Sequence, residues 1–279
     1  MNKFTIIGGY GFIGSEIVNF LKEKNAHIFI PQKDDDKLFR DELGTIIYCA
    51  GYGDCINDPF KVLESNTILL SRILKKSNFD KLIYISSTRI YMENNSSDES
   101  SNFIIDRNDS RKLFNLTKLV SEELCLLSNR NVIIVRPSNV YGLAISSPLF
   151  LPSIVRDAIL KSEVNMYVSP TYEKDYIYVK DVADAIYKLA IIENPKNKIY
   201  NLASGENTNA QQIANVLSTE TGCKVFWHEQ DKMDDNFPVT NIESIKVEIN
   251  FDPKSVLVMM KQMIKDYLVH YRKDKKNEE

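Results

Sequence analysis

The stretch Phe4-Thr5-Ile6-Ile7-Gly8-Gly9-Tyr10-Gly11-Phe12-Ile13-Gly14 decides the fold. An apolar run precedes glycines 8, 11 and 14, and an amphipathic segment follows them. This order predicts a strand, a tight turn and a helix. Gly8 permits the turn, Gly11 lets a diphosphate approach the backbone, and Gly14 lets the helix pack against the strand. The unpaired N–H groups of the helix would face phosphates, so the stretch predicts a dinucleotide site. The alternative is a glycine-rich turn without a ligand.

Bulk composition excludes several classes of protein. The chain has 279 residues, of which 43% are hydrophobic and 26% charged, enough for a large core with a smaller lobe. Its net charge of −3 argues against a nucleic-acid partner. No apolar run approaches the ~20 residues that span a bilayer, so we expect no membrane partner. The chain opens directly into a predicted strand, which argues against a signal peptide. Four scattered cysteines indicate reduced thiols, and together these features favour a cytoplasmic protein. Scattered histidines predict no metal site.

Apolar strand patterns alternate with helical patterns along much of the chain. This alternation predicts a Rossmann-type α/β fold, a doubly wound parallel sheet with a smaller C-terminal α/β substrate lobe. The predicted dinucleotide-binding domain is 1–142, with 175–200 returning to its sheet. The predicted substrate lobe is 143–174 and 201–279. Because ligands gather at the carboxyl ends of parallel strands, the strand-end residues should meet in one crevice. These residues are Gly8, Gly51, Ser87 and Asn139.

The segment after the second predicted strand bears on the choice between NAD and NADP. An NAD site usually carries an acid there, about 20 residues past the glycines, to accept from the ribose 2′-hydroxyl. This chain has Gln32 and Lys33, and its acids 34–36 come slightly late. Gln32 and Lys33 would tolerate a 2′-phosphate, so we favour NADP(H) and keep NAD(H) as an alternative. Lys33 as the first residue of an ordinary loop is the other interpretation.

Six ordered motifs resemble those of the extended short-chain dehydrogenases/reductases that act on sugar nucleotides as epimerases, dehydratases or reductases. The resemblance covers nearly the whole chain. It implies a nicotinamide cofactor in the N-terminal domain and a nucleotide-diphosphate sugar against the C-terminal lobe. The motifs are the glycine stretch 8–14, Ser86-Ser87-Thr88-Arg89-Ile90-Tyr91, the segment ending at Thr117-Lys118, Arg136-Pro137-Ser138-Asn139-Val140-Tyr141-Gly142, Asp175-Tyr176-Ile177-Tyr178-Val179-Lys180-Asp181-Val182-Ala183 and Tyr200-Asn201-Leu202-Ala203-Ser204-Gly205-Glu206.

The resemblance implies a catalytic set with one departure. The family uses a Ser/Thr hydroxyl, a tyrosine that exchanges a proton with the sugar oxygen, and a lysine that holds the nicotinamide ribose. The hydroxyl role falls on Ser87, with Thr88 beside it, and the lysine is Lys118. The tyrosine position, four residues before Lys118, is Phe114. Positions i and i+4 share a helix face, so Phe114 points with Lys118 but has no exchangeable proton.

Three explanations of Phe114 stay open. In the first, the chain is an engineered inactive form. In the second, the proton comes from another group, such as Tyr91, Thr88, a residue of the loop 92–109 or water. In the third, the protein binds its ligands without catalysis. Losing a positioned general acid typically costs ~10²–10⁴-fold in rate.

The resemblance also implies the remaining site residues. Asn139 would contact the diphosphate, and Lys174 replaces an arginine often found before the Asp-Tyr element. Lys174 as a solvated loop lysine is the alternative. The implied cofactor-binding residues are Gly8, Tyr10, Gly11, Phe12, Ile13, Gly14, Gln32, Lys33, Ala50, Gly51, Lys118 and Pro137.

We therefore expect an NADP(H)-dependent reductase of a nucleotide-diphosphate-linked 4-keto sugar. An NAD-dependent sugar-nucleotide epimerase and a catalytically dead dinucleotide-binding module are the alternatives. A 4,6-dehydratase would want an Asp-Glu pair where Arg89-Ile90 stand. We expect a homodimer, with 58–75 and 113–127 as candidate interface helices, although the apolar stripes of both helices are equally expected for core packing.

Overall fold

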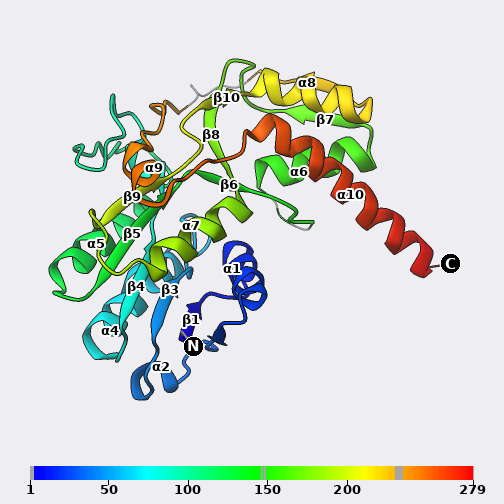
Figure 1. Cartoon of the computed structure of the whole chain (residues 1–279). Helices are drawn as coiled ribbons and strands as arrows, with labels where there is room; N and C mark the ends of the chain where they lie inside the picture. Colours follow the sequence, from blue (N-terminus) through cyan, green and yellow to red (C-terminus); the bar gives the residue numbers. More distant parts are fainter. Residues whose placement is uncertain (1–2, 146, 148, 230–234, 279) are drawn as a thin grey trace.

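The computed structural model describes residues 3–145, 147, 149–229 and 235–278 (Figure 1). Its centre is a six-stranded sheet in which every neighbouring pair is parallel. Along the sheet the strands are β2 (His27–Phe29), β1 (Lys3–Ile7), β3 (Thr45–Tyr48), β4 (Lys81–Ile85), β5 (Val132–Pro137) and β9 (Ile199–Leu202). The chain first adds β2 on one side of β1 and then crosses to add β3 on the other side, so the direction of winding reverses between β1 and β3. This topology confirms the predicted doubly wound fold.

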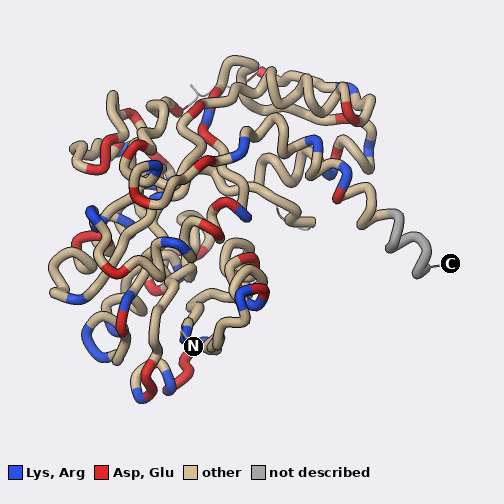
Figure 2. Tube along the Cα trace, in the orientation of Figure 1, with Lys and Arg blue, Asp and Glu red and all other residues tan. Residues whose placement is uncertain are grey.

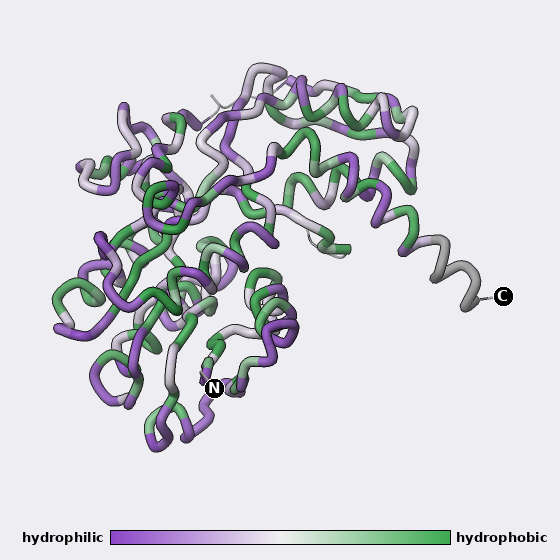
Figure 3. Tube along the Cα trace, viewed as in Figure 1, coloured by the Kyte–Doolittle hydropathy of each residue, from purple (hydrophilic) through white to green (hydrophobic). Residues whose placement is uncertain are grey.

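Helices cover both faces of the sheet, as Figure 1 shows. On one face α1 (Phe12–Glu23) and α7 (Val179–Ile191) lie together and bury Leu21 and Ile186. On the other face α4 (Leu69–Lys76) and α5 (Lys112–Leu127) bury Ile73 and Cys125, with the short α2 (Lys37–Arg40) beside them. Because helices cover both faces, all five residues of β4 are buried. Figure 3 shows hydrophobic residues concentrated along the central strands.

A π-helical turn interrupts the helix expected over 58–75. The segment consists of α3 (Pro59–Leu63), η1 (Glu64–Ile68) and α4. Asn66 lies within η1 and is fully buried. Its Oδ1 accepts from the N–H of Tyr52 at 3.0 Å, and its Nδ2 donates to Thr117 Oγ1 at 3.0 Å. The π turn therefore fastens the loop after β3 to α5, one residue away from Lys118.

The second lobe is built from two small sheets and three helices. One sheet has the order β10 (Asn207–Asn209), β8 (Glu173–Tyr178), β6 (Asn139–Tyr141), and the other pairs β11 (Lys224–Trp227) with β7 (Glu163–Met166). The helices α6 (Phe150–Leu160), α8 (Ala210–Thr221) and α10 (Val256–Glu278) pack on them around a separate core. The lobe lies above the carboxyl ends of the central strands (Figure 1).

One expectation about chain path is wrong. Segment 175–179 does not rejoin the central sheet, because β8 pairs with β6 and β10. The chain returns through α7 and β9, and α9 (Glu243–Ile249) packs on both. The division into two domains stays a prediction.

A buried carboxylate ties the lobes together. Asp175 on β8 accepts from Ser138 Oγ at 2.5 Å, from the Ser204 N–H at 2.9 Å and from the Gly205 N–H at 2.8 Å. Ser138 follows β5 and the other two residues follow β9, so one side chain of the second lobe holds the ends of two central strands. Burial raises the pKa of Asp175, and these donors oppose that rise.

Charge and hydropathy along the chain are mixed. Figure 2 shows acidic and basic residues interspersed over both lobes. Within the residues that the structure describes, no helix is both long and apolar enough to cross a bilayer.

Candidate active site

The glycine stretch forms the predicted strand, turn and helix. Gly8 has a φ of +84°, a conformation that L side chains rarely adopt, and its carbonyl accepts from the Gly11 N–H at 3.0 Å. A Cβ atom on Gly14 would lie 2.2 Å from the Gly8 carbonyl oxygen, so the turn and the helix pack too closely for any side chain. Gly11 stands at the N-cap of α1 without a capping side chain. The structural roles of Gly8 and Gly14 are confirmed, and the contact of Gly11 with a diphosphate stays a prediction.

A cavity of about 570 Å³ opens beside this turn, between the two lobes. Its walls come from the ends of β4 and β5, from α5, and from β6 and β8 of the second lobe. Ten residues singled out from the sequence line it: Phe12, Ile13, Gly51, Ser87, Thr88, Phe114, Lys118, Pro137, Asn139 and Lys174. Seven others lie outside its lining: Gly8, Tyr10, Gly11, Gly14, Gln32, Lys33 and Ala50.

Lys118 is buried in the cavity wall, with 4% of its surface exposed. Its Nζ donates to the Ile85 carbonyl at 2.9 Å and lies 5.7 Å from the ring centroid of Phe114. Burial lowers the pKa of Lys118 to about 8, although Glu122 and Cys49 nearby favour the charged form. The ammonium therefore stands beside the position at which the family has tyrosine.

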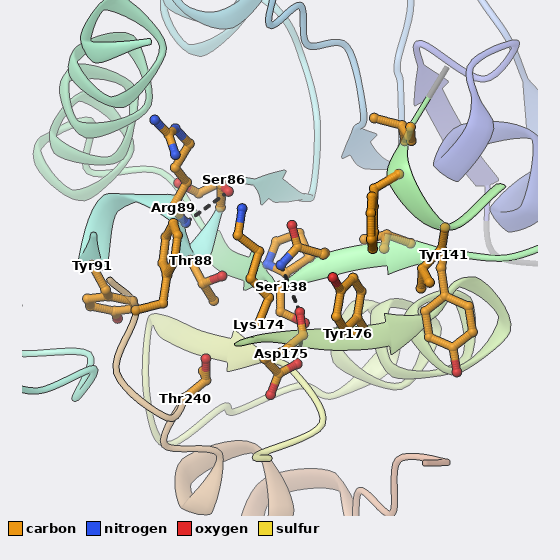
Figure 4. A pocket seen from close by; sticks show the side chains of 18 of the residues that line it. Ser86, Thr88, Arg89, Tyr91, Ser138, Tyr141, Lys174, Asp175, Tyr176 and Thr240 are labelled. Atoms are coloured by element: carbon orange, nitrogen blue, oxygen red, sulfur yellow. Dashed lines mark hydrogen bonds between the residues drawn. The ribbon is translucent and has the colours of Figure 1, made fainter. Parts of the chain in front are cut away.

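Two hydroxyl groups follow β4 at the cavity wall. Ser87 caps the 3₁₀ helix η2 (Thr88–Tyr91), and its Oγ accepts from the Arg89 N–H at 3.1 Å. Among the described residues the Ser87 proton has no acceptor, and the Thr88 hydroxyl has no hydrogen-bond partner. Both hydroxyl groups are therefore available to a ligand oxygen, and Figure 4 shows Thr88 beside the cavity.

The aromatic ring of Phe114 lines the cavity between two cations. The guanidinium carbon of Arg111 lies 5.1 Å from the ring centroid on the same helix segment, and Lys118 lies one turn further on. Phe114 is half-buried. A side chain at this position therefore reaches the same space as Lys118, as the i, i+4 spacing predicts.

Tyr91 also lines the cavity, but its hydroxyl is engaged elsewhere. The group donates to Asn201 Oδ1 at 2.9 Å and accepts from the Arg136 guanidinium. Burial raises the pKa of Tyr91 to about 12. Its fixed partners therefore disfavour Tyr91 as a substitute proton donor.

The loop 92–109, a second candidate source of a proton, is fastened to the protein body. Ser97 Oγ donates to the Val239 carbonyl at 2.7 Å. The Glu99 carboxylate accepts from the Asn201 N–H at 3.1 Å, and the Glu99 carbonyl accepts from Arg136 at 3.1 Å.

A buried ion pair supports this end of the cavity from behind. Arg136 donates to Glu122 through Nε and through NH2, the latter at 2.5 Å, and both side chains are almost fully buried. The Ser86 hydroxyl donates to the same carboxylate. Glu122 is one helical turn beyond Lys118, so the pair links α5 to the ends of β4 and β5.

The opposite end of the cavity belongs to the second lobe. Asn139 Nδ2 donates to the Asp175 carbonyl at 2.8 Å. Lys174 Nζ lies 4.8 Å from the ring centroid of Tyr172 and 4.9 Å from that of Phe237. Figure 4 shows Lys174, Asp175 and Tyr176 along this wall. The Lys174 ammonium therefore lies against two aromatic rings at the cavity wall.

The residues that follow the second strand lie outside the cavity lining. Gln32 Nε2 donates to the Tyr10 hydroxyl at 3.3 Å, and Gln32, Tyr10 and Lys33 are all exposed. The second strand therefore ends near the glycine turn, where a dinucleotide ribose would lie in this fold.

Several lining residues were not predicted as site residues. Arg111 and Arg89 lie near Phe114 and Ser87, and Tyr172 and Phe237 flank Lys174. Arg111 had a usable signal, because it is a cation three residues before Phe114 and directly precedes α5. Phe237 had none, because it comes from an irregular segment distant in sequence.

The Rossmann-type sheet, the glycine turn and the buried Lys118 agree with an extended short-chain dehydrogenase/reductase, with Phe114 as a departure from its tyrosine. Residues 4–203 match the model of the NAD dependent epimerase/dehydratase family, and the chain belongs to that family.

Two curated relatives have different activities in their names. The chain is 28% identical to a putative UDP-glucose 4-epimerase of Methanocaldococcus jannaschii, over 78% of this chain and 82% of the relative. It is 22% identical to a dTDP-4-dehydro-6-deoxy-D-allose reductase of a Streptomyces species, over 96% of both chains.

A solved structure shows the shared fold. The UDP-glucuronic acid 4-epimerase of Bacillus cereus, in complex with UDP-glucuronic acid and NAD, has a TM-score of 0.81 to this chain at 17% identity. The superposition covers 96% of this chain and 99% of that chain.

Proposed function

We propose that this protein is an NADP(H)-dependent reductase of a 4-keto sugar linked to a nucleoside diphosphate. The observation that carries the proposal is the shared cavity. It joins the hydroxyl groups of Ser87 and Thr88 and the ammonium of Lys118 with Asn139 and Lys174 of the other lobe. Lys174 and Asn139 would bind the diphosphate, which leaves the sugar between Ser87 and Phe114.

The residues fit a nicotinamide dinucleotide. The uncapped N-terminus of α1 and the tight turn at Gly8 suit a diphosphate, and Lys118 lies beside Gly51, where a ribose would pass. When bound, the cofactor supplies the hydride. The protein residues bind the two ligands, exclude water from the cavity and hold protons near the sugar oxygen. No acid stands at Gln32 or Lys33, so a 2′-phosphate is tolerated there. The Lys33 ammonium can attract that phosphate and the Gln32 amide can donate to it, which favours NADPH over NADH.

Phe114 itself favours reduction over epimerisation. An epimerase must first remove a proton from a neutral sugar hydroxyl, which requires a positioned base. A reductase only has to protonate an oxygen that becomes strongly basic as the carbonyl is reduced. The Ser87 hydroxyl or a water molecule beside Lys118 can supply that proton, at a reduced rate.

Sequence similarity keeps an NAD-dependent epimerase as the second candidate, because the M. jannaschii relative and the B. cereus structure are named as 4-epimerases. A reductase consumes NADPH in step with product, an epimerase consumes none, and a dead module binds without turnover. Turnover with external NADPH therefore separates the three.

Thermal melting of the purified protein tests the two binding sites directly. The ligands are NADH, NADPH, UDP, GDP, CDP and dTDP. A ligand at 100 times its Kd adds about 2.7 kcal/mol, which raises Tm by several degrees. A shift with NADPH and with one nucleotide supports the reductase, whereas a preference for NADH favours the epimerase. No shift with any dinucleotide, from protein shown to be free of co-purified cofactor, would contradict the whole assignment. The homodimer and the cytoplasmic location stay predictions.

A further inference from the structure

Two arginines in the cavity have no task in the proposed reductase. Arg89 is two residues past Ser87, Arg111 is three residues before Phe114, and both line the cavity. Lys118 is assigned to the cofactor ribose and Lys174 to the diphosphate. The cations left over therefore stand at the end of the cavity where the reacting sugar carbon would lie.

The charges of the cavity lining are unbalanced. Arg89, Arg111, Lys118 and Lys174 face it, whereas Asp175 is its one lining acid among the described residues. The Asp175 carboxylate is already occupied by three donors from the protein. Asp109 and Asp235, which lie outside the lining, pair with Arg89. The positive charge beyond what a diphosphate needs is therefore centred on Arg111.

Arg89 is held in place but is not fully paired. Its Nη2 donates to Asp109 at 2.7 Å, and its Nη1 lies 3.5 Å from the half-exposed Asp235. Its Nε is buried, and none of the described residues accepts from it. Asp109 also accepts from the Arg111 N–H at 2.8 Å, so one carboxylate fixes the relative position of both arginines.

Arg111 forms no ion pair with the residues that the structure describes, so its guanidinium can meet a ligand. Its guanidinium stacks near the Phe114 ring, and no acid among the described residues lies within ion-pair distance of it. Desolvation and then the charge of Arg89 lower the pKa of Arg111, as expected for two cations close together. A bound anion would relieve that repulsion.

Resting on the proposed function, we propose that the substrate sugar carries a carboxylate, as a uronic acid does, and that Arg111, backed by Arg89, binds it. A planar guanidinium matches a carboxylate through two parallel hydrogen bonds, which a neutral CH₂OH group cannot accept. The anion would lie beside Phe114 and so beside the reacting carbon.

The test compares two sugar nucleotides that differ only at this group. The nucleotide that gives the largest melting shift selects the pair: UDP-glucuronic acid with UDP-glucose, dTDP-glucuronic acid with dTDP-glucose, or GDP-mannuronic acid with GDP-mannose. Calorimetry gives both Kd values for the wild type, for Arg111→Gln and for Arg107→Gln. Arg107 is exposed, lies outside the cavity lining and loses the same charge, so it controls for long-range electrostatics.

We expect the wild type to bind the uronic acid roughly tenfold or more tightly than the neutral sugar, the gain of one charge-assisted pair. Arg111→Gln should bring that ratio close to one without weakening the neutral sugar, and Arg107→Gln should keep the ratio. Equal or weaker binding of the uronic acid by the wild type, or a preference that survives Arg111→Gln, overturns this proposal alone. Absence of binding by every nucleotide overturns the proposed function and this inference together.

Discussion

Introducing a phenol at position 114 is the sharpest test of the catalytic site. The Phe114 ring lines the cavity, and Lys118 Nζ lies 5.7 Å from its centroid. Two opposite charges about 6 Å apart attract by roughly 3 kcal/mol at an effective dielectric constant of about 20, which sets the scale on which the ammonium would stabilise a phenolate. The pKa of the new phenol is therefore lowered toward the working pH, where a general acid is most effective.

We expect Phe114→Tyr to raise turnover by at least ~100-fold, because a positioned general acid contributes ~10²–10⁴-fold. The assay follows NADPH oxidation with the 4-keto derivative of the sugar nucleotide chosen by melting. The double variant Phe114→Tyr with Lys118→Met is the matched control, and most of the gain should disappear in it. An unchanged or lower rate in the single variant would refute the view that the site is a short-chain dehydrogenase site lacking only its phenol.

Four further predictions concern stability, cofactor choice and assembly. Glu122→Leu should lower the free energy of unfolding in urea by about 3–5 kcal/mol, because it leaves Arg136 buried and unpaired. The double variant Glu122→Leu with Arg136→Met should recover much of this loss. A loss well below this range in the single variant would contradict the argument. Lys33→Asp should weaken the binding of NADPH roughly tenfold in titrations and leave the binding of NADH little changed, because only NADPH has the 2′-phosphate. Equal losses of affinity for both cofactors would rule out a contact between Lys33 and that phosphate. Val120 on α5 is 50% exposed and should be covered in a homodimer. Val120→Glu should therefore halve the mass measured by light scattering. A monomeric wild type would refute the dimer hypothesis. The pKa of Lys118 is about 8 in the folded protein against 10.5 unfolded, so the unfolded chain binds more protons between these values. Between pH 8 and 10.5 the free energy of unfolding of the wild type should therefore rise by about 3 kcal/mol relative to that of Lys118→Met. If the free energies of the two proteins change with pH in parallel, the lowered pKa of Lys118 is disproved.

Local sequence rules predicted the part of the site that depends on neighbours along the chain. Gly8 and Gly14 are dictated by the turn between strand and helix. The resemblance to the family singled out Phe114 and Lys118, and helical spacing predicts only that they share one face. The hydroxyl groups at Ser87 and Thr88 follow from the end of a buried strand. Each of these needs only a period or a short motif.

Features that depend on distant partners were not predictable. A strand pattern over Glu173–Tyr178 does not tell which edge β8 will pair with, and its partners are β6 and β10. The π turn at Glu64–Ile68 arises because buried Asn66 bonds both the loop after β3 and α5, which no helical periodicity reveals. Phe237 reaches Lys174 from a segment about 60 residues away, so its place in the wall becomes visible only in three dimensions.

The Asp175 tie has a consequence for how such a protein can change its specificity. Because this carboxylate holds Ser138 and the backbone after β9, the lobes cannot swing apart without breaking three hydrogen bonds. A new substrate is therefore more easily accommodated by exchanging wall residues such as Tyr172 and Phe237 than by reorienting the lobes. The half of the cavity that performs the chemistry can stay fixed while residues in the half that selects the ligand change. One scaffold can therefore acquire new substrates through substitutions in the cavity wall alone.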